Sequence, residues 1–254
     1  MKRKIILVGA GGHAKSCINL IEKVNNFKII GLTDSKKRGY LLNYKILGDD
    51  TILDQKKFRN INLCLSFGSI FNINLREKIF QRLKNKGFNF PTLISKESSI
   101  SKFSKIGSGT MIMGNTFVNA GASIGENCII NNNSLIEHDV KIGNNCNIGS
   151  NVILKNSIVG NNTNILDGAI IGKKGFGFFP NKENNIRYPH IGIVIIEDNC
   201  EIGCGSTIDR GSMSNTVIGK NTYLDNQIHI AHNVKIGKNS IIAGQVGIAG
   251  SSVL

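Results

Sequence analysis

Hydrophobic residues follow two different periods along this chain, and the period changes near residue 95. In the first part, short apolar runs alternate with segments of helical spacing. The expected strands span 4–8, 27–32 and 61–67, and the expected helices span 14–24 and about 74–86. Strands that alternate with helices in this way predict a small parallel α/β domain over residues 1–92.

In the second part, large aliphatic residues recur at every sixth position. Nine of them run without a break from Ile100 to Ile148, the register then slips by one residue to Ile153, and the steps of six continue to Leu254. Two interruptions stand out, one at about 173–192 and a shorter one after Ile208. A fixed short period indicates a solenoid in which each unit contributes one strand and one inward side chain. Three units close a triangular coil of about 18 residues, with glycine and asparagine at the positive-φ corners.

The expected fold class is therefore α/β plus β. A small Rossmann-like domain (1–92) precedes a parallel β-helix (93–254), which is interrupted by a loop at about 173–192. The chain stops four residues after Gly250, in the middle of a six-residue unit. We therefore expect the C-terminal end of the β-helix to be incomplete, because an open coil leaves strand groups unpaired.

Composition excludes several classes of protein. Of the 254 residues 41% are apolar, and the apolar runs are too short for a membrane span or a signal sequence, so we expect a cytoplasmic protein. The net charge is +14, of which +12 falls in residues 1–95. Such a basic region attracts phosphates or an acidic carrier protein, or is simply a solvated surface. Basic residues are not interleaved with aromatic ones, so we expect no nucleic-acid partner. The six cysteines form no paired CxxC sets, so we expect neither a disulfide framework nor a metal site.

A glycine-rich turn follows the first expected strand. Gly9-Ala10-Gly11-Gly12-His13-Ala14 fits G-x-G-x-x-G/A and opens a helix, and Asp34 follows the second strand. Small residues and free N–H groups at a helix N-terminus suit a phosphate or nucleotide. A purely structural turn is the alternative. NAD is disfavoured, because about 90 residues make only half of a dinucleotide fold.

Several short segments of the N-terminal part resemble one acetyltransferase family. The matching segments are 8–15, 31–34, Gly48, 66–68 and Arg76. They resemble the sialic acid O-acetyltransferase and bacillosamine N-acetyltransferase family. The resemblance implies that the N-terminal domain binds a nucleotide-linked sugar, with Gly11, Gly12, His13 and Asp34 facing the nucleotide. The six-residue pattern itself resembles acyltransferase β-helices, which implies a left-handed coil.

One motif occurs twice in the repeats, as Ile136-Glu137-His138-Asp139 and as Ile230-Ala231-His232-Asn233. Each histidine lies two residues after an inward aliphatic, so both occupy the same type of corner. A neutral imidazole there could accept a proton from an attacking amine or hydroxyl, and the resulting oxyanion needs a nearby N–H donor. The residue one coil after His232 is Gly250, which leaves room for a backbone N–H to approach. The residue one coil after His138 is Asn156. The pattern therefore favours His232 with Gly250 as the catalytic pair, and leaves His138 as a second catalytic candidate with a structural or substrate-side alternative.

The C-terminal repeats resemble a second family. The matching segments are 175–178, 188–192, 201–203, 207–211, 225–227, 230–233 and 249–251. They look like UDP-3-O-(3-hydroxyacyl)glucosamine N-acyltransferase of lipid A synthesis. The resemblance implies that His232 is the general base, that Gly250 supplies the oxyanion N–H, and that the chain forms a homotrimer with sites between prisms and no metal.

Several residues near this motif keep two interpretations. Asn226 and Gln227 either contact substrate or form a polar corner ladder. Asp209 and Arg210 form an internal ion pair or a substrate clamp. The loop at 173–192, which is rich in glycine and phenylalanine, covers an acyl chain or a neighbouring subunit, or is a plain packed loop.

The sequence thus predicts an N-acyltransferase. It would move an acyl group from acyl-CoA or acyl carrier protein, as co-substrate, to the amine of a nucleotide-linked amino sugar in bacterial surface polysaccharide or lipid A synthesis, with no permanently bound cofactor. One alternative is O-acetylation of a sialic-type sugar by acetyl-CoA through His138. The other is a catalytically silent β-helix that only binds or scaffolds.

Overall fold

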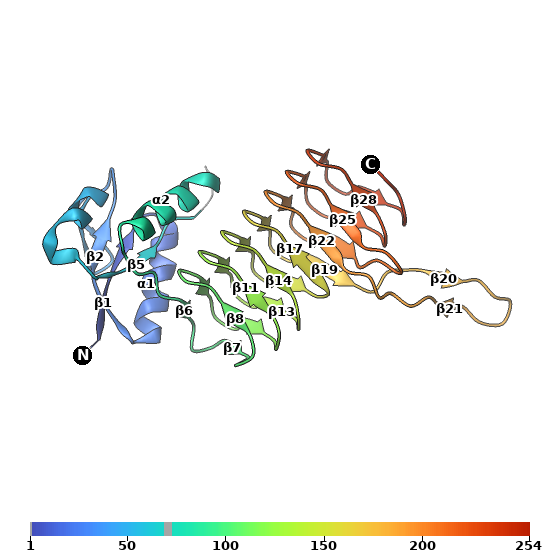
Figure 1. Ribbon diagram of the computed structural model, residues 1–254, viewed down its shortest axis with the longest axis horizontal. Coiled ribbons are helices and arrows are strands. Elements are labelled where there is room, and N and C mark those ends of the chain that lie inside the picture. Colours follow the sequence, from blue (N-terminus) through green and yellow to red (C-terminus); the bar gives the residue numbers. More distant parts are fainter. Residues whose placement is uncertain (1, 69–72) are drawn as a thin grey trace.

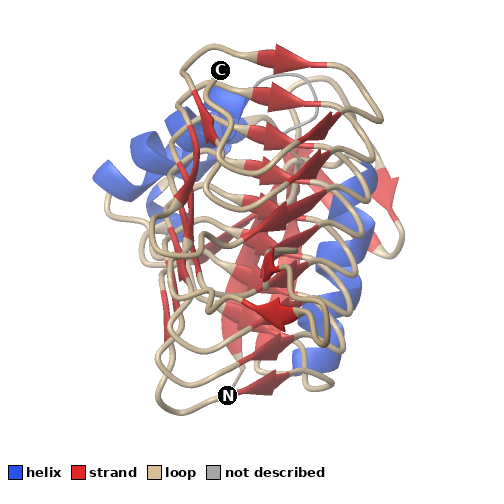
Figure 2. Cartoon of the chain, turned by 90° about the vertical axis from the view of Figure 1, so that its right-hand side faces the viewer, coloured by secondary structure: helices blue, strands red, loops and turns tan. Residues whose placement is uncertain are grey.

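The chain consists of a small α/β unit joined to a long stack of short strands (Figure 1). The computed structural model describes residues 2–68 and 73–254. Viewed from the side of its C-terminus, the stack shows strands joined by loops that repeat from coil to coil, with the helices outside the coils (Figure 2). The stack is a left-handed parallel β-helix, so the predicted fold class is confirmed.

The N-terminal unit is built on a five-stranded sheet of order β3-β4-β2-β1-β5, in which β1 is parallel to both β2 and β5. Its strands are β1 (Arg3–Val8), β2 (Phe27–Thr33), β3 (Tyr40–Leu41), β4 (Tyr44–Gly48) and β5 (Asn62–Leu65); its helices are α1 (Gly12–Val24) and α2 (Ile73–Asn85), with 3₁₀ turns η1 (Asp50–Asp54) and η2 (Lys56–Phe58). The expected strands and helices are present with ends shifted by two residues or less. The sequence missed β3 and β4, because the β3–β4 hairpin has too few residues to show a period.

Helix α1 ties this unit to the β-helix. It buries Cys17, Ile18 and Ile21 on one face, as the helical spacing of these residues requires. This face, together with β1 and β2, shares one apolar core with Met111 and Ile129 of the β-helix. The N-terminal unit therefore packs against the outer surface of the first coils.

Three parallel sheets form the walls of the β-helix. The first sheet holds β6 (Leu93–Ile94), β9 (Met111–Ile112), β12 (Ile129–Ile130), β15 (Asn147–Ile148), β18 (Asn164–Ile165), β23 (Glu201–Ile202), β26 (Tyr223–Leu224) and β29 (Ile241–Ile242). The second holds β7 (Ser99–Ile100), β10 (Phe117–Val118), β13 (Leu135–Ile136), β16 (Ile153–Leu154), β19 (Ile170–Lys173), β24 (Thr207–Asp209), β27 (His229–Ile230) and β30 (Gly247–Ile248). The third holds β8 (Lys105–Ile106), β11 (Ser123–Ile124), β14 (Lys141–Ile142), β17 (Ser157–Val159), β22 (Val194–Ile196), β25 (Thr216–Ile218) and β28 (Lys235–Ile236). We call the turns after strands of these sheets the first, second and third corners.

The aliphatic residues at every sixth position fill the interior of the prism. Ile136, Ile148 and Ile230 are fully buried there, and the same cluster continues through all the coils. The prediction that the register slips at Ile153 is wrong. Leu154 is the buried residue that pairs with Ile136, so the missing residue lies in the turn after it. The pattern could not distinguish the two positions, because both are occupied by large aliphatics.

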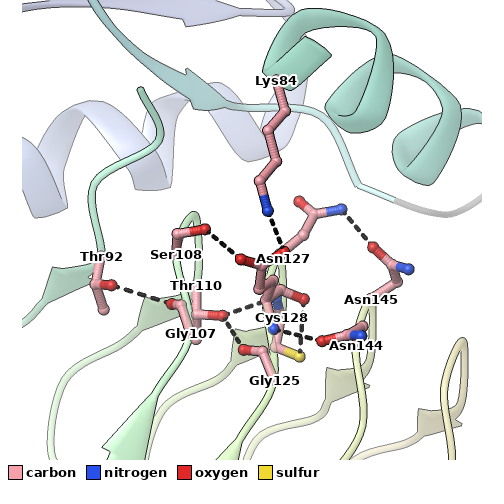
Figure 3. A network of polar contacts seen from close by, with 11 residues as sticks. Lys84, Thr92, Gly107, Ser108, Thr110, Gly125, Asn127, Cys128, Asn144 and Asn145 are labelled. Atoms are coloured by element: carbon pink, nitrogen blue, oxygen red, sulfur yellow. Dashed lines mark hydrogen bonds and ion pairs between the residues drawn. The ribbon is translucent and has the colours of Figure 1, made fainter. Parts of the chain in front are cut away.

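Polar side chains bond along the corners from one coil to the next (Figure 3). At the third corner, the Thr110 hydroxyl donates to the Gly125 carbonyl at 2.7 Å, and the Asn127 amide donates to Asn145 Oδ1 at 2.9 Å. Lys84 of α2 reaches the same corner and pairs with Glu126 at 2.5 Å. The ladder satisfies corner groups that the sheets leave unpaired, and the ion pair adds a second contact between the N-terminal unit and the coils.

A hairpin interrupts the second corner after β19. Its strands β20 (Phe178–Phe179) and β21 (Ile186–Arg187) are antiparallel, and the hairpin projects away from the stack (Figure 1). This excursion lies where the sequence predicts the loop at about 173–192. Its base returns to the coils next to His232, which is where the candidate chemistry lies.

Candidate active site

The imidazole of His232 faces Gly250 across one coil of the second corner. Ile230 pairs with Ile248, so the two corners lie in register. A Cβ atom built on Gly250 would lie 2.8 Å from Cε1 and 2.9 Å from Nε2 of His232. Among the described residues, the Gly250 N–H has no hydrogen-bond acceptor. The glycine thus leaves a narrow gap between the ring and an unused amide.

Asn233 fixes the orientation of the His232 ring. The Ser212 N–H donates to Asn233 Oδ1 at 2.8 Å, which leaves the Asn233 NH₂ group to approach His232 Nδ1 at 3.1 Å. An amide N–H can only donate, so Nδ1 accepts and a neutral ring carries its proton on Nε2. For Nε2 to accept a proton, the proton must move to Nδ1, and this requires a rotation of the ring or of the Asn233 amide that takes the NH₂ group away from Nδ1.

The base of the hairpin covers the other side of His232. A Cβ atom on Gly175 would lie 2.9 Å from His232 Cβ, and one on Gly177 would lie 3.4 Å from His232 Nε2. The ring centroids of Tyr188 and His232 are 6.5 Å apart. Gly175 is thus needed for the approach to His232, and Gly177 for the approach to Tyr188, from which its Cβ would lie 2.9 Å, so the predicted loop packs on the candidate base.

His190 is a second imidazole at this site and is buried, whereas His232 is half-buried; the sequence singled His190 out only as part of a motif. Its ring centroid lies 5.5 Å from that of His232. Nδ1 lies 3.0 Å from the Tyr188 carbonyl, which accepts, so the proton is on Nδ1 and Nε2 is a buried atom without a partner among the described residues. Burial lowers the pKa of His190 and keeps it neutral near pH 7. A histidine after a proline gives no periodic signal by which to find it.

His138 occupies the same type of corner four coils earlier, in different surroundings. Its side chain is 69% exposed, and its Nδ1 lies 3.4 Å from Glu137. Because Ile136 pairs with Leu154, Asn156 stands where Gly250 stands for His232. The Asn156 side chain donates to the Gly172 carbonyl at 3.1 Å. The glycine gap is therefore absent at His138, which matches the contrast drawn from the sequence.

The predicted nucleotide site of the N-terminal unit splits into two parts. Asp34 lines a cavity of about 550 Å³ at the carboxyl ends of β1, β2 and β5. Its carboxylate accepts from the N–H groups of Ala10, Lys36 and Lys37 at 2.9–3.0 Å. Partial burial opposes its ionisation, but these bonds outweigh burial and lower the pKa of Asp34.

Gly11, Gly12 and His13 lie at the start of α1, beside this cavity rather than among its lining residues. A Cβ atom on either glycine would meet nothing within 4 Å, so open space lies over the turn. Burial, followed by the charge of Arg76, lowers the pKa of His13 to about 4. Open backbone above a helix N-terminus suits an anion, whereas Gly9 is required by the chain itself, since its Cβ would lie 2.9 Å from Phe67.

Asn226 and Gln227 lie at the first corner, not with His232 at the second. The Asn226 side chain accepts from the Cys204 N–H at 2.8 Å, and Gln245 donates to Gln227 at 3.1 Å. These are contacts between successive coils, as in a polar corner ladder. Their role in substrate binding stays a prediction.

The expected ion pair between Asp209 and Arg210 is not formed. Asp209 is fully buried and pairs with Lys173 one coil earlier. Arg210 instead donates to the carbonyls of Gly192 and Ile191 at 2.6 and 3.0 Å. The two side chains diverge because Asp209 ends a strand, where neighbours point to opposite faces.

Neither a membrane-spanning helix nor a metal centre emerges from residues 2–68 and 73–254. No helix there is long and apolar enough to cross a bilayer. Groups of three or more potential metal ligands do not gather in the same part of the chain.

The fold and site define a hexapeptide-repeat chain with an α/β N-terminal domain, and comparisons with known families bear this out. Residues 4–83 match the PglD N-terminal domain. Residues 103–138, 121–156 and 215–250 match the bacterial transferase hexapeptide (six repeats).

Curated relatives match through part of the chain only. UDP-3-O-acylglucosamine N-acyltransferase 2 of Legionella pneumophila (strain Paris) is 51% identical over 100 residues, which is 39% of this chain and 29% of that protein. The N-acyltransferase of the same name from Dechloromonas aromatica (strain RCB) is 53% identical over 89 residues, or 35% and 26%. The match thus spans less than a third of the length of these relatives.

Solved structures share the fold over most of the chain. A mutant of perosamine N-acetyltransferase from Caulobacter crescentus, in complex with CoA and GDP-perosamine, is 22% identical with a TM-score of 0.68, covering 81% of this chain and 88% of that one. The acetyltransferase domain of PglB from Neisseria gonorrhoeae is 18% identical with a TM-score of 0.58, covering 96% and 93%. At these identities the likeness establishes the fold.

Proposed function

We propose that this chain is an N-acyltransferase that works at the second corner, with His232 as general base and the Gly250 N–H as oxyanion donor. The observation that carries the proposal is the gap between the ring and the unused amide of Gly250. The curated relatives from Legionella pneumophila and Dechloromonas aromatica are named N-acyltransferases, which supports the same reaction class.

The reaction follows from these groups. The amine nitrogen of the acceptor attacks the carbonyl carbon of an acyl thioester, and His232 Nε2 accepts the amine proton once Nδ1 carries the ring proton. The carbonyl oxygen becomes an oxyanion, which the Gly250 N–H stabilises. The intermediate then collapses, the C–S bond breaks, and the imidazolium returns the proton to the leaving thiolate. An amide and a free thiol result.

We further propose a nucleotide-linked amino sugar as acceptor, and acyl-CoA or acyl carrier protein as donor. The Caulobacter crescentus protein of the same fold is described with CoA and GDP-perosamine, which supports this pairing. Gly11, Gly12, His13 and Asp34 would face a nucleotide in the N-terminal unit. We also propose a homotrimer with sites between prisms and a cytoplasmic location, as the resemblance to the lipid A N-acyltransferases implies.

The experiment compares two histidine variants in the full chain. Thiol release from acetyl-CoA and longer acyl-CoAs is followed with UDP- and dTDP-linked amino sugars. His232→Ala should lower turnover by roughly 10²–10⁴-fold, while His138→Ala should change it little. Full activity in His232→Ala together with loss in His138→Ala would reverse the assignment. Absence of thiol release with every acceptor would favour the silent β-helix.

A second candidate, O-acetylation through His138, has one observation in its favour. The N-terminal unit packs on the first coils, and His138 follows the third strand of the second sheet, whereas His232 follows the seventh. His138 is therefore the histidine nearer to the N-terminal cavity. Hydroxyl and amine acceptors assayed side by side separate the two functions.

A further inference from the structure

A strongly basic pocket lies on the second corner between His138 and His232. It has a volume of about 660 Å³, and five of its seven lining residues are cations, with no carboxylate among them. The cations are Lys155, Lys173, Lys174, Arg187 and Arg210. We call this the basic pocket. Residues 96–254 as a whole carry a net charge of only +2, so the basic pocket concentrates positive charge on an otherwise balanced β-helix.

The protein neutralises this charge only in part. Lys155 pairs with Glu137 at 3.1 Å, and Lys173 pairs with Asp209. Within the described residues no carboxylate contacts Lys174, Arg187 or Arg210. Three cations therefore face one cavity without an anion of the protein, an arrangement that repulsion disfavours unless an anion binds there.

The two arginines are held in place before any ligand arrives. Arg187 donates to the Gly175 carbonyl, and its guanidinium lies 4.5 Å from the ring centroid of Phe178. Arg210 donates to two carbonyls of the returning chain. A guanidinium has five N–H donors, so each keeps donors free for a ligand. Because their rotamers are already fixed, binding loses little side-chain entropy, and planar forks of this kind suit phosphate oxygens.

The basic pocket adjoins the His232 site. Gly175, whose carbonyl accepts from Arg187, also lies against Cβ of His232, and Lys174 precedes it directly. The strand that precedes Arg210 (β24) lies one coil from the strand that precedes His232 (β27), about 5 Å along the axis, and the strand that carries Lys173 (β19) lies two coils from it, or about 10 Å. An anion held at Arg210 would thus be separated from the candidate base, along the axis, by about the span of one sugar residue.

The N-terminal cavity cannot supply this anion to His232 within one chain. The first and seventh strands of the second sheet are six coils apart, or about 29 Å. A diphosphate seated beside Asp34, at the N-terminal side of the first coils, would leave its sugar far short of His232. Chemistry at His232 therefore needs its own phosphate site on the β-helix, and a nucleotide bound in the N-terminal unit is not the one whose sugar reacts at His232.

We infer that the basic pocket binds the diphosphate group of a substrate used at His232, and so forms a second phosphate site distinct from the N-terminal cavity. This inference rests on the proposed function for its assignment to a substrate. The diphosphate belongs either to the nucleotide-linked acceptor or to CoA. The separation of one coil between Arg210 and His232 favours the acceptor, because a sugar ring spans a distance of this size whereas the pantetheine arm of CoA is much longer.

The test measures equilibrium binding of pyrophosphate, UDP-glucosamine and CoA to the full chain by titration calorimetry, without turnover. Lys174→Ala should weaken pyrophosphate binding about tenfold, and Lys174→Glu more. Lys182→Ala, at an exposed lysine of the same hairpin, is the matched control and should bind as the parent does. Lys174 is exposed, so the variants keep the fold, which thermal unfolding checks.

The two sources separate by which ligand responds to Lys174→Glu. Weaker UDP-glucosamine binding with unchanged CoA binding assigns the pocket to the acceptor, and the reverse assigns it to the donor. Unchanged affinity of Lys174→Glu for all three ligands would overturn the inference. Because the readout is binding, failure of the proposed transfer reaction would appear separately, as a chain that binds the diphosphate but releases no thiol.

Discussion

Adding a single methyl group at Gly250 should stop catalysis without unfolding the protein. In Gly250→Ala the new Cβ would lie 2.8 Å from His232 Cε1, whereas ordinary van der Waals contact begins at 3.4 Å. The ring must therefore move by about 0.6 Å or more, and the gap proposed for the reacting carbonyl is filled. A misplacement of about 1 Å can cost about 10²-fold in rate. We expect kcat/KM to fall by roughly 10²-fold in a thiol-release assay.

Gly247→Ala is the matched control for this change. It lies three residues earlier in the same coil, and its Cβ would meet nothing within 4 Å. Neither Gly250 nor Gly247 has a left-handed φ, so alanine costs little backbone strain at either position. Both variants should unfold at the temperature of the parent. If Gly250→Ala keeps more than half of the parent kcat/KM, the gap between His232 and Gly250 is not where the carbonyl reacts.

Three further changes test other parts of the structure. In the folded chain the pKa of His13 is lowered to about 4, so the free energy of unfolding is unaffected by this group above pH 6.5 and falls as the pH drops from 6.5 toward 4. Urea titrations of the parent should show this loss as up to about 3 kcal/mol. The variant His13→Gln should not show it. Asn233→Asp should place a carboxylate at His232 Nδ1, which then donates its proton to that carboxylate and leaves Nε2 free to accept the amine proton; kcat/KM for thiol release should therefore be at least that of the parent, and a fall of about tenfold or more would contradict the assignment of His232 Nε2 as base. Gly172→Ala should destabilise the chain by more than about 2 kcal/mol in thermal or urea unfolding, since φ is +83° and the new Cβ would lie 1.6 Å from the Lys155 carbonyl; a stability equal to that of the parent would refute this.

Most of the fold prediction came from the recurrence of large aliphatic residues at every sixth position. Buried aliphatics such as Ile136 and Ile230 face one shared interior, so their spacing alone specifies coil length and the pairing of His232 with Gly250. The α/β unit was recognisable for a similar reason, because α1 buries one regular face. The spacing failed at Ile153, where two adjacent aliphatics fit equally well.

Contacts between residues that are distant in sequence could not be predicted from the hydrophobic pattern. His190 reaches His232 only because the hairpin folds back, and Arg187 and Arg210 meet Lys155 only after three coils have stacked. The adjacent positions of Asp209 and Arg210 suggested a local ion pair, but the cation that pairs with Asp209 is Lys173, one coil away. Contacts between coils depend on which side chain leaves the corner in which direction, and a single sequence does not specify that.

The regular rise of the coils makes sequence number a measure of position along the axis. Each uninterrupted turn of 18 residues moves a corner by about 4.8 Å and returns it to the same side of the prism. Removing residues 209–230, the turn between Ile208 and Ile230 together with its four-residue loop, would therefore bring the His232 imidazole about 5 Å nearer to Lys173 while its orientation stays the same. Evolution or design can in this way alter the reach between a base and an anchoring charge in fixed increments, and so suit longer or shorter substrates without rebuilding either group.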